Sequence, residues 1–187
     1  MRSLLAAAAM SLLCVPHVNA QQRSIDTQKS RLTIHVGKTG AFSALGHEHE
    51  IHAPIHNGTA DTGAHPAVEI HVNARELRVT DKDASEKERA EVQKTMLGPE
   101  VLDSERHQEI VFKSTGAESV GQGRWTLNGN LTLRGQTRPV TVQVILKDGR
   151  YTGEAKVKQT DFGVTPPGRA GVRAKDEVKI EFDVQLT

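Results

Sequence analysis

The residues best suited to chemistry lie in one short stretch, ALGHEHEIH at positions 44–52, which holds three histidines and two glutamates. On a β-strand, side chains two positions apart point to the same side. His47, His49 and Ile51 therefore share one face, and the two glutamates share the other. Histidines at positions i and i+2 of a strand can both reach one zinc or iron ion, at about 2.1 Å. A metal site using His47 and His49 is therefore one interpretation.

Such a metal site needs a third ligand, which His56, His71 or His107 could supply. The helical zinc signature HExxH is absent, because the residue four positions after His47 is Ile51. In the second interpretation, which we favour, these are polar residues at the mouth or wall of a β-fold, hydrogen-bonded to backbone and water.

Other catalytic and nucleotide-binding motifs are absent from the chain. It contains no GxSxG, GxGxxG or GxxxxGK[ST] sequence, which argues against a serine hydrolase and against nucleotide binding. The tripeptide DFG at 161–163 occurs without the HRD motif of a kinase catalytic loop. We therefore predict a protein that is not an enzyme and that has no cofactor.

The first twenty residues resemble an export signal. Arg2 precedes an apolar run over 4–15, and Val18-Asn19-Ala20 fits the small-residue cleavage pattern. A run of twelve residues is shorter than the roughly 20 needed to span a bilayer as a helix. We expect cleavage after Ala20, a mature domain over 21–187, and a periplasmic or secreted location. The single cysteine lies within the signal, so we expect no disulfide.

The balance of charges also narrows the function. The chain has 24 basic and 23 acidic side chains, whereas a nucleic-acid-binding domain usually carries a basic patch. Six residues are aromatic (four Phe, one Trp and one Tyr), which is few for a stacking platform. We therefore predict no nucleic-acid partner.

Alternation of apolar and polar residues dominates the pattern of the chain. It occurs in RLTIHVG, AVEIHVN, NLTLRG, PVTVQV and VKIEFDV, with turn sequences such as Asn128-Gly129 and Asp148-Gly149 between segments. Period-two alternation is typical of strands with one buried face, and many such strands in one domain predict a sandwich or a barrel.

One segment breaks this pattern. Residues 83–97, DASEKERAEVQKTML, are rich in helix formers, and Ser85 is followed three positions later by Glu88, as in a capping box. Gly98-Pro99 ends the segment. The sequence therefore predicts one helix at about 84–97, inserted in an all-β domain.

Several segments, taken in order, resemble the YceI-like proteins, exported bacterial proteins similar to lipocalins. These are SIDTQKSRLTIHVGKTGAFSALGH at 24–47, PEVLD at 99–103, EIVFKS at 109–114, GNLTLRGQTRPVTV at 129–142, TDFGV at 160–164 and DEV at 176–178. The most specific piece is the fourth, which is similar to the family pattern G-x-L-T-L-x-G-x-T-x-P-V. The GHEHEI stretch departs from many members and marks a histidine-rich variant.

The resemblance implies an eight-stranded antiparallel lipocalin-like barrel around an apolar cavity. It also implies an isoprenoid or other long-chain apolar lipid as ligand, such as a quinone tail or a polyprenyl lipid. The candidate ligand-binding residues are Phe42, Leu45, His47, His49, Ile51, Phe112, Trp125 and Phe162. Transient membrane contact and a homodimer are compatible with this reading. The alternative is a metal- or haem-binding protein that uses His47 and His49.

Overall fold

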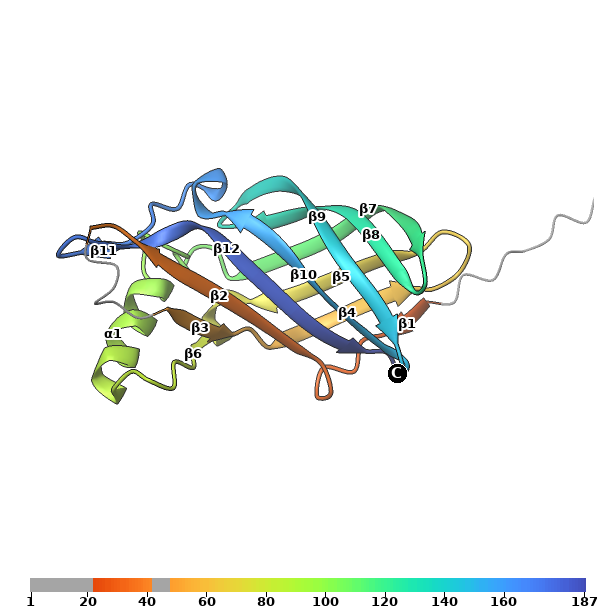
Figure 1. Ribbon diagram of the computed structural model, residues 1–187, viewed down its shortest axis with the longest axis horizontal. Helices are drawn as coiled ribbons and strands as arrows, with labels where there is room; N and C mark the ends of the chain where they lie inside the picture. Colours follow the sequence, from red (N-terminus) through yellow and green to blue (C-terminus); the bar gives the residue numbers. More distant parts are fainter. Residues whose placement is uncertain (1–21, 42–47) are drawn as a thin grey trace, which may run out of the picture.

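The computed structural model describes residues 22–41 and 48–187 of the chain. These residues form one antiparallel sheet of twelve strands and one α-helix (Figure 1). Eight strands have seven or more residues: β2 (Arg31–Thr39), β4 (Ile55–Asp61), β5 (Ala67–Asn73), β7 (Glu109–Gly121), β8 (Arg124–Leu133), β9 (Gln136–Lys147), β10 (Arg150–Lys158) and β12 (Val172–Gln185). Four are shorter: β1 (Gln22–Ser24), β3 (His49–His52), β6 (Arg78–Val79) and β11 (Gly168–Arg169).

The sheet is curled, and consecutive strands of the chain, β3 and β4, lie near opposite ends of its strand order. The strand order is β1-β4-β5-β7-β8-β9-β10-β12-β2-β3-β6, with β11 pairing only with β12. β3 pairs with β2 and β4 pairs with β5, although only Ala53 and Pro54 separate β3 from β4. The chain therefore passes from near one end of the strand order to near the other within a few residues.

Backbone hydrogen bonds join the same two sides again at the end of the chain. The Thr187 N–H donates to the Ser24 carbonyl at 2.9 Å, and the Asp26 N–H donates to the Gln185 carbonyl at 2.9 Å. Ile25 also bridges Leu186, while its N–H donates to the Gly58 carbonyl of β4. The segment at β1 thus lies between β4 and the end of β12, so few strand edges are left unpaired.

The prediction of an all-β antiparallel barrel with one inserted helix is confirmed, but the predicted number of strands is wrong. The structure has twelve strands, because β1, β6 and β11 have only two or three residues and do not show as alternating runs. In addition, Pro54 has no N–H to give to a ladder and separates β3 from β4.

The helix α1 spans Glu86–Leu97 and begins two residues later than predicted, because Ser85 is its N-cap. The Ser85 hydroxyl accepts from the Glu88 N–H, and the Glu88 carboxylate accepts from the Ser85 N–H at 2.8 Å. Two 3-10 turns, η2 (Ala74–Glu76) and η3 (Gln159–Phe162), complete the regular elements. No helix among the described residues is long and apolar enough to cross a bilayer.

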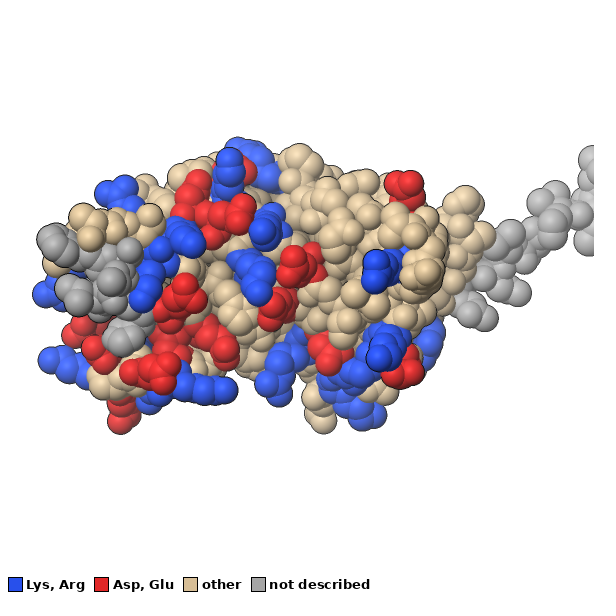
Figure 2. All heavy atoms as spheres, viewed as in Figure 1, with Lys and Arg blue, Asp and Glu red and all other residues tan. Residues whose placement is uncertain are grey.

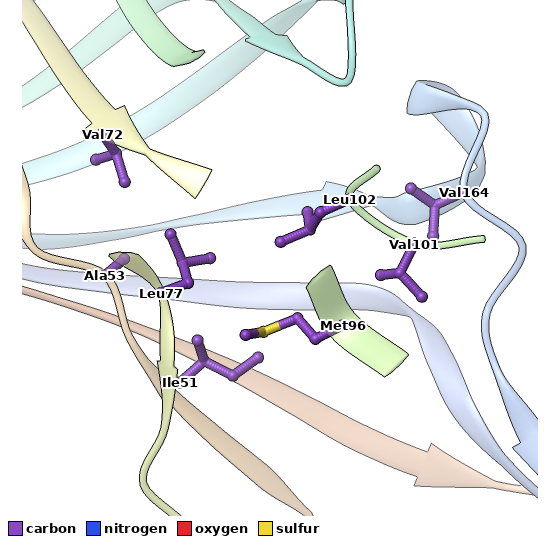
Figure 3. Close-up of a cluster of buried hydrophobic side chains, with 8 residues drawn as sticks. All are labelled: Ile51, Ala53, Val72, Leu77, Met96, Val101, Leu102 and Val164. Atoms are coloured by element: carbon purple, nitrogen blue, oxygen red, sulfur yellow. The ribbon is translucent and has the colours of Figure 1, made fainter. Parts of the chain in front are cut away.

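The helix covers one end of the barrel, which we call the helix end. Met96 of α1 points toward Ile51 of β3 and Leu77, as Figure 3 shows. Five further buried residues complete this cluster: Ala53, Val72, Val101, Leu102 and Val164. The segment after the helix is held by backbone bonds, among them the Leu102 N–H to the Met96 carbonyl at 3.0 Å. The hairpin turns at Gln122-Gly123 and Asp148-Gly149 lie at the opposite end (Figure 1).

Close packing of β9, β10 and β12 makes a test of the fold. A Cβ added at Gly153 would overlap the Gln143 carbonyl oxygen and would lie 2.7 Å from the Phe182 ring. Substituting Gly153→Ala should therefore lower the free energy of unfolding by about 1–3 kcal/mol, the usual cost of overpacking.

Gly116→Ala is the matched control, because a Cβ at Gly116 in β7 meets nothing within 4 Å. Its effect should stay within roughly 1 kcal/mol and favour folding, since alanine costs less backbone entropy than glycine. Urea denaturation of both variants measures the difference, and equal stabilities would contradict the described packing.

Candidate functional site: an apolar cavity in the barrel

A cavity of about 1050 Å³ occupies the inside of the barrel. This volume lies just above the roughly 300–1,000 Å³ typical of ligand pockets. Every long strand contributes to its wall. Apolar residues from the strands form much of the lining, among them Leu32, Ile34, Val36, Val68, Ile70, Val72, Ile110, Phe112, Trp125, Leu127, Leu131, Leu133, Val140, Val142, Val144, Ala155, Val157, Val178, Ile180, Phe182 and Val184.

The cavity wall follows directly from the alternation in the sequence. Val140, Val142 and Val144 of β9 line the cavity, whereas Thr141 and Gln143 between them are exposed. The same alternation places Ile180, Phe182 and Val184 of β12 on the wall. Because successive side chains of a strand point to opposite faces, an alternating strand in a curled sheet turns one uniformly apolar face inward.

The structure brings four of the eight predicted ligand-binding residues together. His49, Ile51, Phe112 and Trp125 line the cavity. Phe162 is not among the lining residues: it is 1% exposed and belongs to a buried cluster with Leu131, Val157 and Val178. Phe42, Leu45 and His47 lie outside the described residues. The roles of all eight in binding stay predictions.

Several lining residues were not singled out from the sequence. Most are the alternating valines, leucines and isoleucines, whose period of two identifies a buried face but not the space in front of it. Polar and charged lining residues were also missed, namely Lys38, Asp61, Thr62, Glu91, Thr95, Glu100, Tyr151, Gln159, Arg169 and Arg173. No sequence motif distinguishes them from other surface residues.

His49 is held in place by a buried carboxylate. Asp81 is 6% exposed, and one of its oxygens lies 2.7 Å from His49 Nδ1. The other oxygen accepts the Glu50 backbone N–H at 2.6 Å. An ionised carboxylate only accepts hydrogen bonds, so His49 Nδ1 must carry the proton of this bond. The Nε2 edge of the ring is then left to contact other groups.

A second, polar hollow of about 430 Å³ adjoins the outside of this pair. It is lined by His35, Lys38, Glu48, His49, Glu50, Asp81, Lys82, Asp83 and Ala84. Lys38 and His49 line both this hollow and the apolar cavity. These two residues therefore lie where the apolar cavity adjoins the polar hollow.

Two of the three histidines proposed to complete a metal site, His71 and His107, lie beside carboxylates elsewhere in the structure. The His71 ring lies between the carboxylates of Glu109, at 2.9 Å, and Glu69, at 3.0 Å. The hydrogen bond to Glu109 is the main cause that raises the pKa of His71, and the hydrogen bond to Glu69 adds to it. His107 lies 3.9 Å from Asp103. Within residues 22–41 and 48–187, no group of three or more His, Cys, Asp or Glu side chains could hold a metal ion, so nothing there favours the metal alternative.

Comparisons with curated proteins give relatives of low identity. A UPF0312 protein of Azotobacter vinelandii is 31% identical over 102 residues, which cover 49% of this chain and about half (53%) of that protein. A UPF0312 protein of Shewanella oneidensis is 25% identical over 166 residues, which cover 82% of each chain.

Among solved structures, Burkholderia cenocepacia BcnA has a TM-score of 0.66 at 18% identity, covering 86% of this chain and 98% of that one. A polyisoprenoid binding domain from Saccharophagus degradans has a TM-score of 0.53 at 10% identity, covering 88% and 97%. At these identities the two structures support the fold alone. The family description "YceI-like domain" matches residues 24–186, and the chain therefore belongs to the YceI-like family.

Proposed function

We propose that the protein binds, without transforming it, an isoprenoid or other long-chain apolar lipid, whose hydrocarbon chain lies inside the barrel. The observation that carries the proposal is the cavity of about 1050 Å³ with an almost continuous wall of aliphatic and aromatic side chains. A solved structure of the same fold is described as a polyisoprenoid binding domain, which supports the proposal.

The physical driving force for such binding is the removal of hydrocarbon from water. Each buried CH₂ group contributes roughly 0.8 kcal/mol, so affinity grows with the length of the chain and needs no precise polar contacts. A flexible chain pays an entropic cost on binding, and this cost is smaller for the stiffer, unsaturated and branched chain of an isoprenoid than for an alkane. The wall, rich in branched Val, Ile and Leu side chains, suits such a chain.

The cellular setting belongs to the same proposal. A carrier or store for a lipid that is insoluble in water is needed where that lipid must leave a membrane. The signal-like residues 1–20 support export to the periplasm or to the outside of the cell, with transient membrane contact when the ligand is exchanged.

The first test is to identify what the protein carries. The full chain is produced in a bacterial host without a histidine tag, purified from the exported fraction, and analysed by native mass spectrometry. Extraction with organic solvent should release a lipid with a long apolar chain in close to equimolar amount. Bound metals are measured on the same batch. Stoichiometric metal that is lost from a His47→Ala, His49→Ala double variant, with no lipid released, would overturn the proposal.

The second test places a charge on the cavity wall. Val140→Asp in β9 should reduce lipid retention at least about tenfold, since a carboxylate facing hydrocarbon is strongly unfavourable. Thr141→Asp, on the exposed face of the same strand, is the matched control and should retain lipid as the wild type does.

Far-UV circular dichroism of both variants checks that the barrel still folds. Equal retention by Val140→Asp and Thr141→Asp, with both folded, would argue against an interior site.

A further inference from the structure

Exposed apolar side chains gather at the end of the barrel opposite to α1, which we call the hairpin end. Among the described residues, the large apolar side chains that are clearly exposed are Val120 at 56%, Ile145 at 44% and Leu146 at 37%. The first lies near the end of β7 and the other two near the end of β9. Arg124 of β8 pairs with Gly121 on one side and with Ile145 on the other. The register therefore brings the three side chains to one place, which we call the apolar corner.

The apolar corner is continuous with the cavity. Along β9, Leu146 lines the cavity, whereas Ile145 does not and belongs to the outer face. Tyr151 of β10 pairs with Leu146 and also lines the cavity. Trp125 and Val144 form another such pair on the wall. Apolar surface therefore runs from the outside of β9, over the end of the strand, into the interior of the barrel.

The turns beside the apolar corner are too short to cover the cavity. Two residues, Gln122 and Gly123, connect β7 to β8, and two residues, Asp148 and Gly149, connect β9 to β10. All four have positive φ, between 52° and 76°, as in the tight two-residue turns that join antiparallel strands. Such turns continue the line of their strands and do not fold over an opening. The wall of the cavity thus reaches solvent at the exposed Leu146.

The distribution of charge distinguishes the two ends of the cavity. Asp61, at the end of β4, is the charged lining residue at the hairpin end. The charged lining residues at the helix end are Lys38, Glu91, Glu100, Arg169 and Arg173. Few charged side chains lie over the β7–β8 hairpin in Figure 2, whereas charged side chains of both signs gather at the helix end. Charged groups are costly in hydrocarbon, so the hairpin end is the one suited to contact a bilayer.

The chain also enters the barrel at the hairpin end. Gln22, the first residue of β1, pairs with Asp61 at the end of β4, as the position of β1 in Figure 1 shows. Six residues, 16–21, separate β1 from the apolar run over 4–15, and six residues span at most about 21 Å. A signal sequence holds its chain at the membrane until it is cleaved. With residues 1–20 acting as such a signal, the precursor is held with its hairpin end close to the membrane.

Resting on the proposed function, we propose that the hairpin end docks on the surface of a lipid bilayer and that the apolar lipid passes between bilayer and cavity there. Val120, Ile145 and Leu146 enter the outer part of the bilayer, where their exposed apolar area is removed from water. Docking places the cavity against the hydrocarbon of the membrane. The ligand then moves from one apolar environment to another without crossing water.

The charges next to the apolar corner balance one another. Arg124 pairs with Ile145, and Lys147 follows two positions later on the same face of β9. Glu118 of β7 and Asp148 of the β9–β10 turn supply two negative charges nearby. Docking therefore depends on apolar contact and not on anionic phospholipid. Vesicles of neutral phosphatidylcholine should bind the protein as well as vesicles that contain anionic lipid, within about threefold.

The experiment measures docking and transfer with the exported chain. Docking is measured by flotation with phosphatidylcholine vesicles, and transfer by the rate at which fluorescently labelled geranylgeraniol moves from donor to acceptor vesicles. The double variant Val120→Thr, Ile145→Thr should reduce both about tenfold, because it replaces inserted hydrocarbon by hydroxyl groups. Threonine keeps the β-branched shape that suits a strand. The affinity for labelled geranylgeraniol in solution should not change, since neither residue lines the cavity.

A second variant tests the same corner in the opposite direction. Val120→Trp, Ile145→Trp should increase vesicle docking about threefold or more, because tryptophan favours the membrane interface. The matched control is Thr115→Trp, Thr141→Trp, which adds the same side chains at exposed positions of β7 and β9 away from the hairpin end. This control should dock as the wild type does. A gain in docking cannot result from loss of the fold.

The outcomes separate the two proposals. A wild type that does not bind labelled geranylgeraniol in solution contradicts the proposed function, whatever the vesicles show. A wild type that binds this lipid but does not float with neutral vesicles overturns the inference alone, as does a threonine variant that docks and transfers normally. An equal gain from the control tryptophans also overturns it. Analytical ultracentrifugation adds one more outcome: a wild-type dimer that the threonine variant abolishes, without vesicle binding, would show that a second copy covers the corner.

Discussion

The structure depends on one constraint: every long strand must turn an apolar face toward the inside of a curled sheet. Because side chains alternate along a strand, a shift of its pairing register by one residue would reverse that strand's two faces. The inward residues are mostly valine, leucine and isoleucine, with few large rings. Side chains of this size cover the wall without filling the space across the barrel. The cavity is therefore a consequence of sheet curvature combined with moderate side-chain volume.

Different buried clusters close the barrel at the helix end and beside the segment that joins β4 to β12. At the helix end, α1 lays Met96 against Ile51 and Leu77 and forms a buried cluster that closes part of the opening. Its capping box and the backbone bonds after Gly98 hold the helix in that position. A second cluster joins residues near the two ends of the described chain to β4. It consists of Ile25, Ile55, Val184 and Leu186. Further buried clusters lie along the wall, one around Leu131, Val157, Phe162 and Val178 and one around Val142, Val144 and Ala155.

Buried polar chemistry is confined to a small region near the helix end. Asp81 is buried, yet both of its carboxylate oxygens have partners, which removes the penalty of an unsatisfied polar group. Among the described residues, no buried side-chain nitrogen or oxygen lacks a hydrogen-bond partner. The outward-facing histidines, His35 and His71, pair with glutamates on the surface of the sheet and do not contribute to the cavity. The polar groups thus leave the apolar wall uninterrupted except at its rim.

The sequence by itself determined the architecture in outline. Alternation in segments such as PVTVQV predicted strands with one buried face, and the capping box at Ser85 predicted the helix, because both signals are local. Several pieces along the chain also carried the family resemblance. The apolar wall at Val140, Val142 and Val144 was visible as a buried face, but not as the wall of a cavity.

Only the tertiary structure decided which residues meet. The hydrogen bond between His49 and Asp81 joins positions 32 residues apart, and the pairing of Lys38 with Ala174 depends on the register of β2 against β12. Phe162 looked like a ligand contact in the sequence, and the structure packs it among Leu131, Val157 and Val178. Contacts between distant segments depend on how the strands curl and pair, and a period of two along each strand carries no information about that geometry.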